Sequence, residues 1–119
     1  ALEAAELLHR EGIAARVIDC YSIKPIDIAT LRVAARETKV IVTCEDHYPE
    51  GGMGEAIAVA VSGTGTPVHV LAVTETLHSA KGRELLTEQG LDAKGIFMAA
   101  TQALAKAQRR IRDLVGKKF

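Results

Sequence analysis

Aromatic residues, net charge and long hydrophobic runs are all scarce in this sequence of 119 residues. Tryptophan is absent, aromatic residues make up 3% of the chain, and 15 lysines and arginines balance 15 aspartates and glutamates. This balance excludes a global attraction to nucleic acid or to an anionic membrane. No apolar run approaches the roughly 20 residues that span a bilayer. A length of 119 residues predicts a single domain. Because 48% of the residues are hydrophobic but only 3% are aromatic, we expect an aliphatic core.

Cysteine is also rare. The two cysteines, Cys20 and Cys44, each lie at the end of a predicted strand, which indicates free thiols in a reducing compartment. Neither has the neighbours that would make it a nucleophile. We therefore expect both thiols to be buried and structural.

The hydrophobic pattern alternates between segments typical of helices and segments typical of strands. Expected helices are 1–11, 27–37, 53–62, 83–89 and 93–115, and expected strands are 13–20, 39–45 and 68–73. Gly12 ends the first helix, and Asp27 and Asp92 cap later ones. Residues predicted to face inward are Leu2, Ala5, Leu8, Ile28, Leu31 and Ala35. This order predicts an α/β domain with three α/β/α layers and a mostly parallel sheet. The first helix begins at residue 1 without a cap, which suggests a piece of a larger protein.

Polar side chains and glycines fill the loop between the strand 39–45 and the helix 53–62. The candidate site residues here are Glu45, Asp46, His47, Tyr48, Glu50, Gly51, Gly52, Gly54 and Glu55. In open α/β sheets, sites gather beyond the carboxyl ends of strands. The glycines permit a sharp turn or the close approach of another backbone. We expect a structured loop that docks against a protein surface.

Two more specific functions of this loop have less support from the sequence. A dinucleotide cradle needs a third glycine where Ile57 stands, and the clustered carboxylates would repel a phosphate. A metal site built from the acidic residues and His47 lacks any familiar ligand spacing. The basic residues near the end of the chain could form a nucleic-acid arm, but without interleaved aromatics a solvated helix end is favoured.

Several motifs together resemble one family. They are DCYSIKPID at 19–27, EDHYPEGGMGEA at 45–56, LAV at 71–73 and GLDA at 90–93. Over residues 1–100 these segments resemble the C-terminal domain of transketolase, with the animal-type enzymes closer. Related but less similar loops occur in deoxyxylulose-phosphate synthase and in the β subunits of 2-oxoacid dehydrogenases, and the C-terminal domain of either protein is the enzyme alternative. An alternative that is not an enzyme is a free-standing binding module that uses the glycine-rich loop.

The resemblance implies a cytoplasmic enzyme of the pentose phosphate pathway that transfers two-carbon ketol units between sugar phosphates. In that family, thiamine diphosphate and a divalent metal, Mg or Ca, lie between the first two of three domains, across a homodimer interface. The third domain supports the dimer and supplies no catalytic groups. The resemblance therefore implies no catalytic, cofactor or metal residue in this chain, and His47 becomes a hydrogen-bonding loop residue. The implied partners are the remaining transketolase domains or subunit.

The sequence departs from the family in two places. Residues 79–82 read SAKG, where the family usually has Ser-Gly-Lys-Pro. The family's domain also has about two further strands, one of them between the segments at 13–20 and 39–45. The resemblance therefore predicts a domain that lacks its N-terminal strands.

Overall fold

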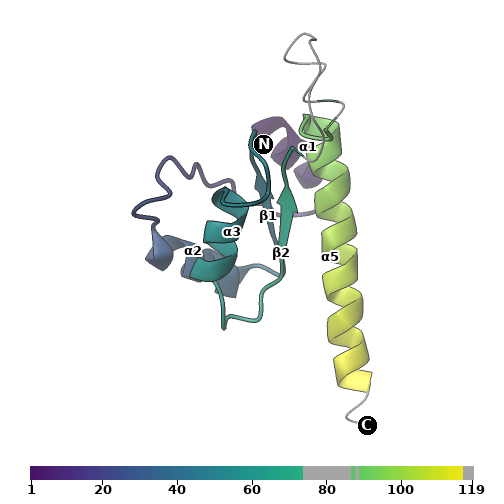
Figure 1. Ribbon diagram of the computed structural model, residues 1–119. Helices are drawn as coiled ribbons and strands as arrows, with labels where there is room; N and C mark the ends of the chain where they lie inside the picture. The colour runs from purple at the N-terminus through teal and green to yellow at the C-terminus, as the bar shows by residue number, and fades with distance from the viewer. Residues whose placement is uncertain (74–86, 88, 117–119) are drawn as a thin grey trace.

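The computed structural model describes residues 1–73, 87 and 89–116 (Figure 1). Its elements are α1 (Leu2–Arg10), α2 (Ile28–Glu37), β1 (Ile41–Cys44), α3 (Met53–Ala60), β2 (Val68–Leu71) and α5 (Ala93–Gly116). The two strands are parallel, with Ile41 opposite Val68. In Figure 1, α2 and α3 lie on one side of the strands and α5 on the other, with α1 packed against α5. The predicted α/β fold with a parallel sheet is confirmed.

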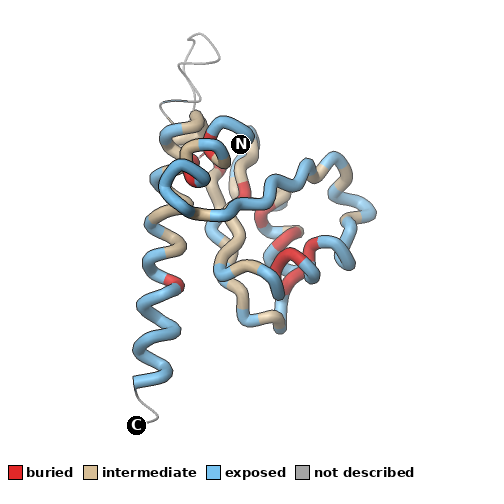
Figure 2. The backbone as a smooth tube through the Cα atoms, turned by 180° about the vertical axis from the view of Figure 1, so that it is seen from behind, coloured by how far each residue is buried: buried red, intermediate tan, exposed pale blue. Residues whose placement is uncertain are grey.

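Small aliphatic side chains form the core. The buried cluster joins Leu31 and Ala35 of α2 to Ile57 and Ala60 of α3, and Ile41 of β1 packs against it. Alanine at the contact positions lets the two helices approach closely and still exclude water. Figure 2 shows that the buried residues concentrate there, whereas most of the segment before α2 and the end of α5 at 108–116 are exposed. The expected aliphatic core is confirmed.

Three predicted residues at helix ends are confirmed, whereas α3 ends at Ala60, two residues before its predicted end. Asp27 caps α2, because its carboxylate accepts a hydrogen bond from the Thr30 backbone N–H at 3.0 Å. The carboxylate of Asp92 accepts one from Gly95 N–H at 2.8 Å at the start of α5. The chain leaves α1 through Gly12 at φ 75°, which is left-handed backbone that favours glycine. The predicted loop 74–82 and most of the predicted helix 83–89 lie outside the described residues.

Two predicted inward positions are wrong. Leu2 is 76% exposed and Ile28 is 49% exposed, whereas Ala4 and Ala34 are buried instead. Each mispredicted residue is the first residue of its helix. A periodic pattern gives the buried face of a helix but not how far along the helix its partner extends.

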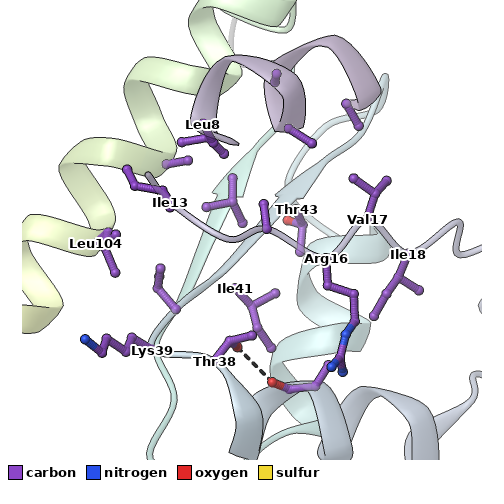
Figure 3. A pocket seen from close by; sticks show the side chains of 18 of the residues that line it. Leu8, Ile13, Arg16, Val17, Ile18, Thr38, Lys39, Ile41, Thr43 and Leu104 are labelled. Atoms are coloured by element: carbon purple, nitrogen blue, oxygen red, sulfur yellow. Dashed lines mark hydrogen bonds between the residues drawn. The ribbon is translucent and has the colours of Figure 1, made fainter. Parts of the chain in front are cut away.

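The predicted strand at 13–20 is also wrong. Within the described residues the sheet has two strands, β1 and β2, and residues 14–20 form no backbone–backbone hydrogen bond. A strand exists only where a ladder partner satisfies its backbone groups. Here the segment passes β1 at a distance, and a cavity separates the two (Figure 3). The β-branched segment therefore has no ladder partner among the described residues.

Of the helices in the described ranges, none is both long enough and apolar enough to cross a membrane.

Candidate functional site

The inner side of the glycine-rich loop is organised by Glu45, the first residue after β1. Its backbone N–H donates to the carbonyl of Leu71, which continues the pairing with β2. Its carboxylate accepts hydrogen bonds from the backbone N–H of Met53 at 2.6 Å and of Gly54 at 2.9 Å. These two N–H groups belong to the first turn of α3, where a helix lacks internal acceptors and carries a partial positive charge. Glu45 thus joins the end of the strand to the start of the helix.

Glycine is required at two positions beside this carboxylate. A Cβ on Gly52 would overlap the Glu45 carboxylate and lie 2.9 Å from the Tyr48 carbonyl oxygen. A Cβ on Gly54 would lie 2.7 Å from both methyl groups of Val70 on β2. The close approach predicted from the sequence is therefore real, and it is an approach to this chain's own residues.

The turn itself depends on Gly51 and Glu55. Gly51 has φ 70°, a conformation that side chains with a Cβ rarely adopt. Its backbone N–H donates to the Glu55 carboxylate at 2.8 Å. Glu55 stands in the first turn of α3 and reaches back to the loop, in the manner of a capping box. Glu45 before the loop and Glu55 after it thus both stabilise the conformation of the loop.

The outer side of the loop presents the remaining predicted residues to solvent. Asp46, His47 and Glu50 are exposed, and Tyr48 is 52% exposed. The His47 ring Nδ1–H donates to the Tyr48 carbonyl at 2.7 Å, and the two rings meet edge to face with centroids 6.4 Å apart. The His47 carbonyl accepts from Val73 N–H at 3.0 Å, which holds the loop against the chain after β2. The outer surface of the loop is thus a contacting pair of aromatic rings flanked by carboxylates.

This arrangement does not fit thiamine diphosphate. A diphosphate would need the free N–H groups at the start of α3, and the Glu45 carboxylate already occupies those of Met53 and Gly54. Asp46 and Glu50, which are exposed in the loop before α3, add further negative charge. In the described part of the chain no three His, Cys, Asp or Glu side chains are grouped to hold a metal ion. We derive no step of catalysis from these residues.

The two cysteines have free thiols and are only partly buried. The prediction of reduced thiols agrees with this structure, whereas the prediction of full burial does not. Burial raises the pKa of the Cys44 thiol above its ordinary value, so this thiol stays protonated at neutral pH. Cys20 points its sulfur toward the Ser22 carbonyl at 3.6 Å. Neither has the character of an activated nucleophile.

Sequence reasoning missed a second feature, a cavity of about 550 Å³ between residues 13–20 and β1. Figure 3 shows Ile13, Val17 and Ile18 on one side of it and Ile41 and Thr43 on the other. Helices α1 and α5 line it from one layer, and α2 and α3 from the other. An ion pair between Arg16 and Glu37 ties the outer segment to the end of α2. The sequence signal for this feature is the apolar run at 13–20, which predicts a strand.

Comparison with known proteins gives a consistent picture. The sequence model of the family "Transketolase, C-terminal domain" matches residues 1–96. Human transketolase is 47% identical over 109 residues, which is 90% of this chain and 18% of that protein. Bovine transketolase-like protein 1 is 45% identical over 108 residues, with 89% of this chain and 18% of that protein covered. The chain thus spans less than a fifth of the length of these relatives.

Solved structures agree with the sequence comparison. A structure described as a split-gene transketolase, inactive beta4 tetramer, superimposes with a TM-score of 0.82 at 41% sequence identity. The match covers 87% of this chain and 35% of that one. The family model covers most of the chain, and the predicted resemblance is confirmed. This chain belongs to the transketolase C-terminal domain family.

Proposed function

We propose that this chain is the non-catalytic C-terminal domain of a transketolase. Its parent enzyme transfers two-carbon ketol units between sugar phosphates, with thiamine diphosphate and a divalent metal held by other domains. The domain contributes to assembly of the parent, a homodimer, and is inactive by itself. Its glycine-rich loop contacts the other domains or the second protomer.

The proposal is supported by the difference between the two sides of the loop, because the inner side is hydrogen-bonded within the domain and the outer side is exposed. Each oxygen of the inward Glu45 carboxylate accepts a hydrogen bond from an N–H group of α3, so this side chain has a structural role in the loop. On the outward side the His47 ring donates a hydrogen bond to the Tyr48 carbonyl, and the Tyr48 ring meets the His47 ring edge to face. Rigid, half-exposed aromatic side chains are typical of protein interfaces. The carboxylates beside them repel anionic substrates and suit a partner rich in hydrogen-bond donors.

Calorimetry on the purified chain tests the non-catalytic part of the proposal. Thiamine diphosphate is titrated into the chain in the presence of Mg²⁺ and, separately, of Ca²⁺. We expect no heat of binding, because the start of α3 is already capped by a carboxylate. Glu45→Gln is the matched variant, since it removes the negative charge and keeps the side-chain size. Micromolar binding by the unmodified chain would overturn the proposal.

A further inference from the structure

The apolar stripe of α5 continues beyond the part of the helix that packs on the domain. Leu104 lines the cavity beside β1, and Ala107 is buried at 7% exposure. Ile111 follows Leu104 by seven residues and Leu114 follows Ala107 by seven, so all four share one face of the helix. Ile111 and Leu114 are nevertheless 52% and 58% exposed, and Val115 beside them is 55% exposed. This second part of the stripe has no cover among the described residues (Figure 2).

Positive charge surrounds the uncovered part of the stripe. The helix from 104 to 116 contains four basic residues and one acidic residue, Asp113. The basic residues are Lys106, Arg109, Arg110 and Arg112. Within residues 1–73, 87 and 89–116, none of these four side chains takes part in an ion pair or a hydrogen bond. In a heptad with Leu104 and Ile111 at position a, Arg110 stands at g, beside the stripe, and Arg109 stands at f, on the opposite face.

One helix of another polypeptide fits both the width and the charge of this surface. A stripe built from a and d positions is as wide as the contact that one partner helix makes. Carboxylates beside the partner's own apolar stripe would meet the cations that flank Ile111 and Leu114. A second copy of α5 would instead bring the cations of the two helices together, and like charges at such positions repel.

Two other classes of partner fit less well. A nucleic-acid backbone would pair with the cations but would leave the three aliphatic side chains uncovered. A flat bilayer would need open space on the side of α5 that the stripe faces. The domain lies on that side, because Leu104 and Ala107 of the same face pack on it (Figure 1). A narrow partner can lie along the end of α5 that projects past the strands.

We propose that the end of α5, residues 104–116, is a docking surface for an acidic amphipathic helix of another polypeptide. The apolar stripe of that helix covers Ile111, Leu114 and Val115, and its flanking carboxylates pair with Arg110 and Arg112. Apolar contact supplies the affinity, and charge selects the partner and speeds the encounter. The family model matches residues 1–96, so the proposal rests on residues that follow this match and not on the proposed function.

Fluorescence anisotropy of a labelled peptide titrated with the chain tests the proposal. The probe has three repeats of Glu-Ile-Ala-Ala-Leu-Glu-Gln, which puts Ile at a, Leu at d and Glu at the flanking e and g positions. Binding is measured at about 0.15 M salt, where the Debye length is about 8 Å and distant charges are screened. We expect saturable binding with a Kd below about 100 µM, and a titration that shows no saturation in this range would overturn the proposal. The same peptide with Lys in place of Glu should not bind.

Matched variants separate docking from general charge attraction. Ile111→Gln should raise the Kd at least about tenfold, because it places a polar amide in the centre of the contact, and Gln keeps the helix propensity. Val59→Gln, at a valine of α3 that is 73% exposed, should leave the Kd unchanged. Arg110→Glu should raise the Kd at least about fivefold, whereas Arg109→Glu on the opposite face should raise it less than about twofold. Circular dichroism checks that each variant keeps its helix content.

Each alternative occupant gives a different result. Equal losses for Arg110→Glu and Arg109→Glu would show unspecific attraction, and the proposal would be wrong. A dimer of the chain alone in sedimentation that Ile111→Gln dissociates would assign the stripe to a second copy and would also overturn it. Binding to vesicles of phosphatidylcholine and phosphatidylserine without binding to the acidic peptide would assign the stripe to a membrane, with the same consequence.

Discussion

Replacing Glu45 by alanine tests the local architecture of the loop most severely. The substitution removes the acceptor of two backbone N–H groups, at 2.6 Å from Met53 and 2.9 Å from Gly54. Hydrogen bonds to a charged partner contribute about 1.5–3 kcal/mol each, and the two are not additive because one side chain makes both. Loss of a helix N-cap alone costs about 1 kcal/mol. We therefore expect Glu45→Ala to lower the free energy of unfolding by about 2–4 kcal/mol.

Urea unfolding at pH 7, followed by far-ultraviolet circular dichroism, measures this change. The midpoint should fall while the slope with urea concentration stays the same, because the substitution removes an interaction without changing the surface exposed on unfolding. Glu45→Gln should lose about half as much, since its single amide oxygen replaces the two carboxylate oxygens that accept the bonds.

Asp46→Ala is the matched control for this experiment. Asp46 is the next residue and is exposed, and among the described residues no hydrogen bond or ion pair involves its side chain. Its removal should change the free energy of unfolding by less than about 0.5 kcal/mol, as is usual at such surface positions. If Glu45→Ala were as mild as Asp46→Ala, Glu45 would not join β1 to α3, and the account of the loop would be refuted.

Three further predictions concern other parts of the fold. Gly54→Ala should lower the free energy of unfolding by about 1–3 kcal/mol because its Cβ meets Val70, and adding Val70→Ala should recover part of this loss in a double-mutant cycle. The hydrogen bonds from Thr30 lower the pKa of Asp27 below its ordinary value of 3.8, so its stabilisation is present above that pH and is lost as the pH falls through the lowered value. Asp27→Asn should therefore flatten the acid limb of a stability–pH profile, and an unchanged limb would contradict this. Iodoacetamide at pH 8 should modify Cys44 more slowly than a free thiol because burial raises its pKa, and mass spectrometry that finds free-thiol rates would disprove it.

Much of the fold follows from local sequence signals. Asp27 and Asp92 begin helices where their side chains cap the first turn, and Gly12 leaves a helix through left-handed backbone. These features depend on a few neighbouring residues, so the sequence predicts them directly. The same holds for the close packing at Gly52 and Gly54, because a glycine between a strand and a helix indicates a close approach.

What the sequence could not predict depends on partners that are distant along the chain. The pattern at 13–20 is that of a strand, but a strand also needs a hydrogen-bonded neighbour, and no described residue provides one. The sequence does not show the different roles of the loop carboxylates either, because each role depends on which residues the carboxylate contacts in the fold. Glu45 and Asp46 are adjacent acidic residues, yet only Glu45 points toward the start of α3.

The central proposal is that the outer side of the loop serves assembly of the parent enzyme and not substrate binding. Sedimentation equilibrium on the parent with His47→Ala and Tyr48→Ala tests it most directly, with sugar-phosphate KM measured on the assembled fraction. Both side chains are exposed, so the fold of the domain should be unaffected. We predict a dimer dissociation constant raised at least about tenfold, which corresponds to 1.4 kcal/mol of lost contact, with KM unchanged. A parent that stays fully dimeric at nanomolar concentration while its KM rises would show that the loop binds substrate, and would contradict the proposal.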